Sequence, residues 1–291
     1  TRYEATYSGI KKNWGIHGFN NHEDVAFKEG YIEKYFPHYL PLKKELLIRR
    51  DSAKNDTSRK FFGALYIYVY TIFENLWYGY IMSYAKELNL CFKFGKANWT
   101  FKNPYQTHLP SFSSAIVHLG TCRDLFFILL KLCIEPESVK DTKAFMKLIK
   151  VQYTRNNFKK DLSKLSEDND KAYLNDGMRV YEGNQFRNFF AHRMRLLWWQ
   201  NKKLDLEDRY FLRKETFEAI KNRQDQVFAQ HIIEMLSDHT TYENKIENSQ
   251  GSDIISAGEI LKDTHDSIAS FLDKSYKFVT EFIVNERHFK K

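Results

Sequence analysis

Glycine, proline and cysteine are all scarce in this chain. It has 12 glycines and 5 prolines among 291 residues, so the residues that the turns of many short strands require are missing. This scarcity argues against a many-stranded sandwich or barrel and favours long helices joined by a few loops. Only three cysteines are present, Cys91, Cys122 and Cys133, without a CxxC pair, so neither a disulfide framework nor a zinc site is indicated. We interpret them as small buried hydrophobic residues in a reducing compartment, the cytoplasm.

Several functional motifs are also missing. The chain begins TRYEATYSG, without the basic start and apolar core of a signal peptide, so we expect no secretion signal. There is no GxGxxG or P-loop pattern, which argues against nucleotide hydrolysis. The spacing of His231, Glu234 and His239 matches no metal motif that we can defend. We therefore predict neither a metal nor a cofactor.

Aromatic residues and positive charge are abundant. Aromatic side chains make up 16% of the chain, and the formal net charge is +8 with a pI near 9.1. A basic protein attracts polyanions without specificity. The excess of charge gives weak support to a nucleic-acid partner, and solubility alone explains it equally well.

One stretch, residues 61–85, is long and apolar enough to suggest a membrane-spanning helix. It carries a single charge, Glu74, and eight of its residues are Tyr, Trp or Asn spread along its length. A membrane span would keep its aromatic residues near its ends and would avoid a charge at its middle. We therefore expect a buried helix at the centre of a bundle and no membrane partner.

The hydrophobic periodicity predicts an all-α helical bundle with additional helices and loops, and no internal repeat. We predict helices over residues 25–39, 59–90, 113–133, 141–158, 184–200, 214–238 and 256–288. Between them we expect an irregular lead-in over 1–30, a polar stretch over 43–60, a loop over 91–113, a loop or marginal helix over 159–176, a short extended pair over 201–213 and a flexible linker over 243–253. The predicted division is a lead-in of residues 1–58 and a helical domain of residues 59–291, which form one compact unit.

The stretch NQFRNFFAHRMRLLWW, residues 184–199, combines a basic face with an apolar one. On a helical wheel Asn188 and His192 lie one turn apart, and Arg187 and Arg195 lie in the same polar sector. Arginine holds a phosphodiester with a planar fork that stays charged, and it stabilises a pentavalent phosphorane. Histidine titrates near neutrality and can move a proton to or from a ribose oxygen. An ordinary solvated helix face is the competing interpretation.

The six residues RNFFAH, Arg187 to His192, resemble the R-x4–6-H motif of the HEPN (higher eukaryotes and prokaryotes nucleotide-binding) superfamily. Asn188 matches the polar residue that ribonuclease members favour after the arginine. The resemblance is sharp over these six residues and loose elsewhere, through helix order and aromatic content. It implies an all-α fold with a four- or five-helix core that carries the motif on one helix.

The resemblance also implies a function. HEPN ribonucleases cleave RNA without a metal, because the 2′-hydroxyl attacks the adjacent phosphate and leaves a 2′,3′-cyclic phosphate and a 5′-hydroxyl. Arg187 and His192 would be the catalytic pair, with Asn188 as an orienting neighbour. Two copies of the motif face each other across a dimer in the family, so a homodimer with a composite site is expected.

The family also suggests the biological setting. Its members include toxins of toxin–antitoxin pairs and abortive-infection proteins, so an antitoxin or another regulatory partner is expected. Met194 stands where toxins silenced by nucleotidylation carry tyrosine, so that mode of regulation is not supported. Other members are inactive and bind nucleotides or partners, which is the alternative function. A helical scaffold in which Arg187 and His192 are plain surface residues is the third possibility.

Further residues are candidates for supporting roles. Glu74 and Asp124 are acidic residues on expected helices, where a structural salt bridge is the competing explanation. Lys143 and Lys147 belong to a lysine row at helical spacing that also contains Lys140 and Lys150. This row would follow an RNA backbone, aided by Arg155, Lys159 and Lys160, or would be only a solvated face. Two further arginines beside the motif, Arg193 and Arg195, are also predicted to bind RNA.

Overall fold

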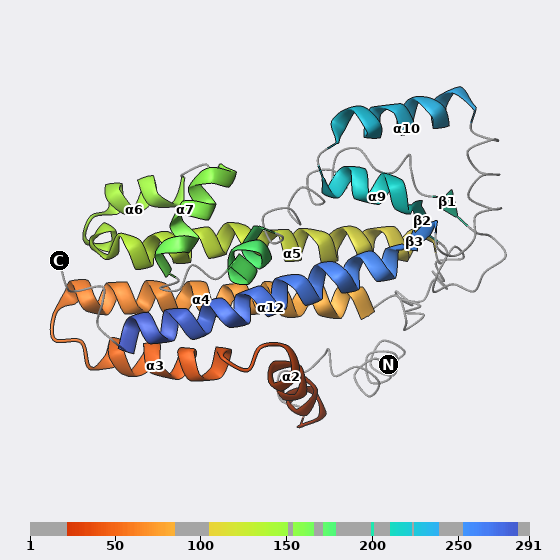
Figure 1. Cartoon of the computed structure of the whole chain (residues 1–291). Coiled ribbons are helices and arrows are strands. Elements are labelled where there is room, and N and C mark those ends of the chain that lie inside the picture. The colour runs from red at the N-terminus through yellow and green to blue at the C-terminus, as the bar shows by residue number, and fades with distance from the viewer. Residues whose placement is uncertain are drawn as a thin grey trace, which may run out of the picture. The chain divides into compact units, whose positions relative to one another are not determined.

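The computed structural model describes residues 22–84, 105–150, 154–165, 171–178, 199–200, 210–222, 224–238 and 253–284. Helices account for most of these residues (Figure 1), so the predicted all-α fold class is confirmed. The helices are α2 His22–Tyr35, α3 Tyr39–Asp51, α4 Asp56–Tyr84, α5 Tyr105–Ile134, the 3-10 turn η1 Pro136–Lys140, α6 Thr142–Ile149, α7 Arg155–Leu165, α9 Lys214–Lys221, α10 Asp225–Ser237 and α12 Ala257–Val284. A further helix covers residues 171–178. The strands are β1 Trp199–Gln200, β2 Tyr210–Arg213 and β3 Ile254–Ser256.

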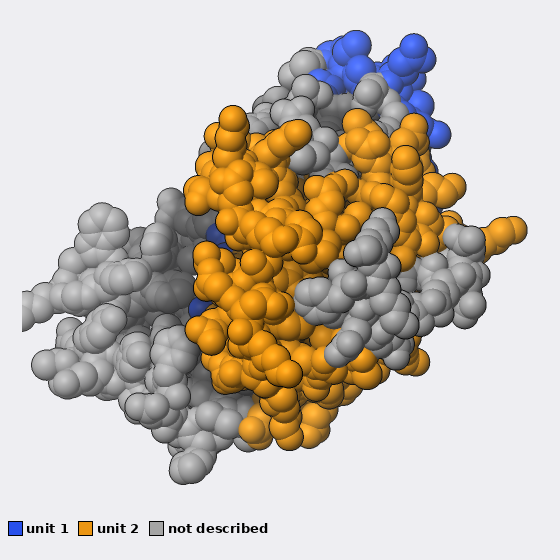
Figure 2. All heavy atoms as spheres, turned by 90° about the vertical axis from the view of Figure 1, so that its left-hand side faces the viewer, with its two compact units in different colours: residues 1–26, 78–118, 182–265 blue, residues 27–77, 119–181, 266–291 orange. Residues whose placement is uncertain are grey.

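The chain forms two compact units, which Figure 2 shows in blue and orange. Unit 1 comprises Thr1–Ala26, Tyr78–His118 and Glu182–His265. Unit 2 comprises Phe27–Trp77, Leu119–Tyr181 and Asp266–Lys291. Helices α4, α5 and α12 each contribute residues to both units. The boundary that we predicted between residues 58 and 59 stays a prediction.

Unit 2 is a helical bundle with a core of aromatic rings. Tyr39 of α3 stacks on Phe73 of α4, with ring centroids 4.0 Å apart. Phe126 of α5 meets Phe271 of α12 edge to face at 5.2 Å. Such ring pairs add packing energy to the apolar area that they bury. The high aromatic content of the sequence is therefore used where α3, α4, α5 and α12 run side by side in this unit (Figure 1).

Buried polar groups of this core find partners on neighbouring helices. The Tyr276 hydroxyl on α12 donates a hydrogen bond to the Val69 carbonyl on α4 at 2.8 Å, and the Cys122 thiol on α5 donates to the Ile72 carbonyl at 3.5 Å. Cys122 and Cys133 are both buried, as predicted, and burial raises the pKa of the Cys133 thiol to about 12. Cys91 lies outside the described residues. These thiols therefore behave as small core residues rather than as reactive groups.

A second layer of shorter helices covers the bundle of unit 2. Phe158 of α7 contacts Phe127 of α5 with ring centroids 4.6 Å apart. Tyr173, on the helix over residues 171–178, stacks on Phe271 at 5.3 Å. α6 lies before α7 in the chain and buries Leu148. The layer is thus anchored on the bundle by buried aromatic and apolar side chains.

The described part of unit 1 contains a small antiparallel sheet of strand order β1-β2-β3, and α9 and α10 lie between β2 and β3 in the chain. Trp199 pairs with Phe211, and Phe211 pairs with Ser256. β2 confirms the second half of the predicted extended pair. The prediction of a helix through residue 200 is wrong at its last two residues. Trp199 and Gln200 form hydrogen bonds with β2 and do not continue an α-helix.

Three predicted boundaries in the first half of the chain are wrong. The helix expected to end at residue 39 ends at Tyr35, and α3 begins at Tyr39 after Pro37. The stretch 43–60, predicted to be polar, is helical up to Asp51 in α3 and again from Asp56 in α4, and α3 buries Leu42 and Leu46 at i and i+4. The predicted loop 91–113 is helical from residue 105, where α5 begins. In α3, burial of these two leucines outweighed the polar composition of the stretch.

Two predicted single helices are divided. The helix expected over residues 141–158 becomes α6 and α7. The segment 159–176 continues α7 to Leu165, and the helix over 171–178 begins within it. The helix expected over 214–238 breaks at Asn222, between α9 and α10. The final helix is confirmed within its described range, as α12. The hydrophobic periodicity predicted that these segments are helical, but it did not predict the short breaks at polar residues.

The apolar stretch at residues 61–85 lies largely in α4. Its buried side chains include Leu65, Val69 and Leu76, all fully buried. Of the helices that the structure describes, not one has both the length and the apolar character that a membrane span requires. In unit 2, α4 packs against α3, α5 and α12 through the contacts given above.

Candidate nucleic-acid interface

The sequence motif with Arg187, Asn188 and His192 lies outside the described residues, as do Arg193 and Arg195. Their predicted roles stay predictions. The described chain resumes at Trp199, in β1, immediately after this stretch. The residues of the candidate interface that the structure does place are Glu74, Asp124 and the basic residues of α6 and α7.

Glu74 and Asp124 lie in different helices of unit 2. Glu74, on α4, is half-buried near Tyr39 of α3. Burial raises the pKa of the Tyr39 hydroxyl, and the negative charge of Glu74 raises that pKa further. Asp124, on α5, has its Oδ1 atom 3.3 Å from Nε of Arg123. Both carboxylates have structural neighbours, and their predicted role as supporting residues stays a prediction.

The lysines of α6 lie on the solvent side of an amphipathic helix. Lys143 and Lys147 are exposed, whereas Leu148 is buried and holds the helix on the unit. Asp141 is the N-cap: its Oδ1 atom accepts a hydrogen bond from the Lys143 amide at 3.1 Å, and Oδ2 accepts one from the Ala144 amide at 3.2 Å. This cap satisfies two amides of the first turn of α6 and fixes where the helix begins.

The neighbouring helix α7 has the same organisation. Arg155, Lys159 and Lys160 are exposed, while Phe158 and Leu162 are fully buried. The apolar residues recur at i and i+4 and leave the basic residues outside. α6 and α7 therefore present cations to solvent from a common layer of unit 2.

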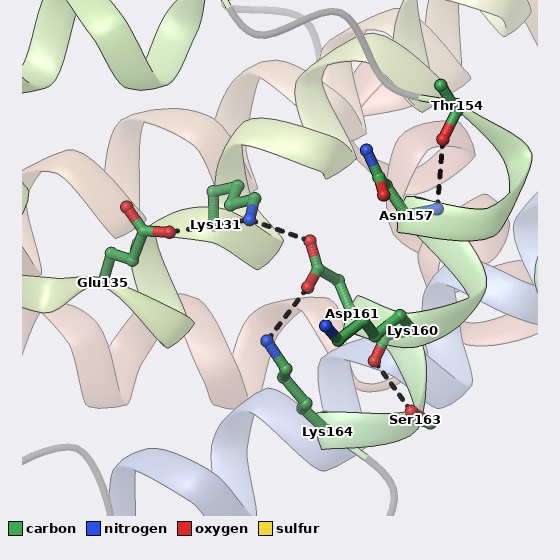
Figure 3. Close-up of polar contacts among 8 residues, drawn as sticks. All are labelled: Lys131, Glu135, Thr154, Asn157, Lys160, Asp161, Ser163 and Lys164. Carbon is green, nitrogen blue, oxygen red and sulfur yellow. Dashed lines mark hydrogen bonds and ion pairs between the residues drawn. The ribbon is translucent and has the colours of Figure 1, made fainter.

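The one acidic residue of α7 is directed elsewhere. Asp161 is 4% exposed and forms ion pairs with Lys131, whose Nζ atom is 3.0 Å away, and with Lys164, whose Nζ atom is 3.2 Å away. Figure 3 shows Asp161 between these two lysines, with Glu135 on the far side of Lys131. A buried carboxylate needs such partners, since an unpaired buried charge is strongly unfavourable. Asp161 thus links α7 to α5 through Lys131 and also pairs with Lys164 within α7.

Sequence reasoning missed two arrangements of histidine in unit 1. His231 of α10 lies 2.9 Å from the Thr216 hydroxyl through Nδ1 and 3.5 Å from a Glu215 oxygen through Nε2. Hydroxyl, imidazole and carboxylate are thus in the order of a nucleophile relay. However, Thr216 is fully buried, so a substrate has no access to it. The arrangement joins α9 to α10, and no spacing in the sequence signalled it.

The second arrangement pairs histidine with tyrosine rings. His118 of α5 lies 5.5 Å from the Tyr78 ring, and His265 of α12 lies 5.1 Å from the Tyr80 ring. Burial lowers the pKa of His118, so this ring is neutral over more of the physiological range. In the part of the chain that the structure describes, no three His, Cys, Asp or Glu residues are grouped so that they could hold a metal ion.

Comparison with protein-family models, with curated proteins and with solved structures found no match to this chain. The description of function therefore rests on the residues themselves.

Proposed function

We propose that this protein is a HEPN-type endoribonuclease that cleaves RNA without a metal ion. The observation that carries the proposal is the spacing of Arg187, Asn188 and His192, which resembles the ribonuclease form of the HEPN motif. The all-α fold of the described chain is compatible with that resemblance. The setting that we propose is a toxin or abortive-infection system in the cytoplasm, with an antitoxin or another regulatory partner.

The proposed reaction needs only these side chains and the substrate. The ribose 2′-oxygen loses its proton and bonds to the adjacent phosphorus, and the 5′-oxygen of the next nucleotide leaves with a proton. His192 moves a proton in this exchange. Arg187 stabilises the additional negative charge on the phosphorane oxygens, and Asn188 orients the phosphate. The products are a 2′,3′-cyclic phosphate end and a 5′-hydroxyl end.

Cleavage of single-stranded RNA in EDTA tests this proposal. Wild-type protein is compared with the Arg187→Ala and His192→Ala variants, and Arg59→Ala, at an exposed arginine of α4, is the matched control. We expect wild type and the control to produce cyclic-phosphate ends, and we expect the rate to fall by a factor on the order of 10² or more in the two motif variants.

Two outcomes contradict the proposal. Equal cleavage by all four proteins would mean that the activity belongs to a contaminant or to other residues. Binding of RNA or nucleotide without cleavage by wild type would favour the noncatalytic HEPN-like alternative. A 2′-deoxy substitution at the cleavage site must also abolish cleavage, because the proposed nucleophile is then absent.

A further inference from the structure

One short segment of this protein is strongly basic. Residues 142–160 contain six lysines and arginines and no aspartate or glutamate. This segment therefore carries +6 of the net charge of +8 and leaves +2 for the rest of the chain. The six cations form what we call the α6–α7 basic surface: Lys143, Lys147, Lys150, Arg155, Lys159 and Lys160, all exposed.

The lysines of this surface lack acidic partners within the described residues. No ion pair there involves Lys143, Lys147, Lys150, Lys159 or Lys160. Elsewhere in the same unit, exposed lysines do have such partners: Lys60 pairs with Asp56, and Lys274 pairs with Asp176, both at 2.7 Å. Like charges one helical turn apart repel each other. A row of such cations is therefore available to a polyanion that would relieve the repulsion.

The burial of the apolar residues favours a nucleic acid over a membrane. A helix that binds a lipid surface keeps its apolar face free to enter the headgroup region. Here Leu148, Phe158 and Leu162 are buried in unit 2. The exposed large apolar side chain of α6 is Met146, at 39%. The exposed side chains of this surface are mostly cationic and few are apolar, as expected of a surface that binds a phosphate backbone.

We propose that the α6–α7 basic surface binds the phosphodiester backbone of single-stranded RNA without reading its bases. Lys143 and Lys147 are separated by about 6 Å along the helix axis, and flexible lysine stems can adjust to successive phosphates. Phe158 is buried and unavailable for stacking on a base, and phosphate contacts position a strand without specifying its sequence. The choice of RNA as the polyanion rests on the proposed function; the binding itself does not require cleavage.

The test measures binding of the full chain to labelled single strands at several salt concentrations. The variants Lys143→Gln/Lys147→Gln and Lys159→Gln/Lys160→Gln are compared with Lys54→Gln/Lys277→Gln, a matched pair of exposed lysines elsewhere in unit 2. RNA and DNA strands of one sequence are used, because DNA lacks the 2′-hydroxyl and escapes the proposed cleavage. Circular dichroism and urea midpoints verify that each variant is folded.

We expect both surface variants to bind RNA and DNA more weakly, to a similar extent for unrelated sequences. The slope of log K against log salt should become shallower by about 0.7 for each lost phosphate contact, or about 1.4 for each pair. The control pair should retain the wild-type slope. Unchanged slopes in both surface variants would overturn the inference. Loss of binding to anionic vesicles with unchanged binding to RNA would also overturn it, in favour of a membrane.

The binding test of the basic surface can be distinguished from the cleavage test of the proposed function. If the lysine variants lose RNA binding while Arg187→Ala and His192→Ala cleave like wild type, the surface stands and the catalytic proposal fails. If those two variants lose cleavage while the lysine variants bind like wild type, the catalytic proposal stands and the surface fails.

Discussion

Gly177 lies between neighbouring helices of unit 2 with no room for a side chain. A Cβ atom there would come within 2.4 Å of Leu162 Cδ1 on α7 and 2.9 Å of Phe271 Cε2 on α12. The Leu162 methyl is the end of a flexible side chain, but the Phe271 ring is fully buried among other rings. The glycine is therefore a packing requirement, although it sits inside the helix over residues 171–178, where glycine costs helical stability.

The Gly177→Ala variant should be less stable than wild type. Overpacking of a buried site costs about 1–3 kcal/mol, and the gain in helix propensity returns about 1 kcal/mol. We expect a net loss of up to about 2 kcal/mol in the free energy of unfolding, measured by urea denaturation.

Gly63→Ala is the matched control for this substitution. Gly63 lies inside α4, and the nearest atom to an added Cβ is Arg50 Cδ at 3.9 Å, an ordinary contact distance. In Gly63→Ala only the helix propensity changes, so the free energy of unfolding should rise by about 0.5–1 kcal/mol. A shift of both variants in the same direction would contradict the packing explanation.

At the scale of the element, several helices begin at a side-chain cap, whereas α3, α9 and α10 begin without one. Ser256 and Glu259 form a reciprocal capping box at the start of α12: the Glu259 carboxylate accepts from the Ser256 amide at 2.8 Å, and the Ser256 hydroxyl accepts from the Glu259 amide at 3.2 Å. Asn55 caps α4 by accepting from the Ser58 amide at 2.7 Å. Such caps satisfy amides that the helix itself leaves unpaired.

Asp141 should matter more to α6 than the other caps matter to their helices, because α6 has only eight residues. In Asp141→Ala the amides of Lys143 and Ala144 lose their acceptors, and the local free energy of opening should fall by about 1 kcal/mol. Hydrogen exchange of the α6 amides should then be faster by about fivefold. Asp141→Asn retains a capping oxygen and should exchange like wild type. Equal acceleration in both variants would assign the effect to charge instead.

At the scale of the whole molecule, the proposed composite site requires two chains. We predict that the purified protein has a mass of about 70 kDa in light scattering, twice the chain mass of 34.8 kDa, as for the two-fold dimers common among soluble proteins. Mixing Arg187→Ala with His192→Ala protein should restore part of the cleavage activity, because a mixed dimer holds one intact arginine and one intact histidine. A monomer that cleaves RNA would contradict the composite site.

The charged residues of the molecule also fall into two groups: those in ion pairs near the core and those exposed to solvent. Acidic residues pair with lysines near the core, as Asp161 does with Lys131. The segment of residues 142–160, with α6 and the first half of α7, carries six exposed cations and no acidic residue. The net charge in the composition therefore gave only weak support to a nucleic-acid partner, whereas its location on one exposed layer defines a specific surface to test.

The sequence by itself determined the fold class and the amphipathic faces of the helices. Scarce glycine and proline, together with 3.6-residue periodicity, predicted an all-α chain, and the spacing of Lys143 and Lys147 opposite Leu148 predicted which side of α6 is exposed. The two described cysteines were also predicted correctly as buried. These properties are local: they depend on residues three or four positions apart, which a sequence shows directly.

Only the tertiary structure decided the features that depend on distant segments. The α3 helix forms in a polar stretch because Leu42 and Leu46 are buried in unit 2. Trp199 leaves the predicted helix because it pairs with Phe211, and Asp161 can be buried because Lys131 of α5 supplies a countercharge. Each outcome depends on a partner far along the chain, and no local pattern encodes which distant residue will supply the burial, the hydrogen bond or the countercharge.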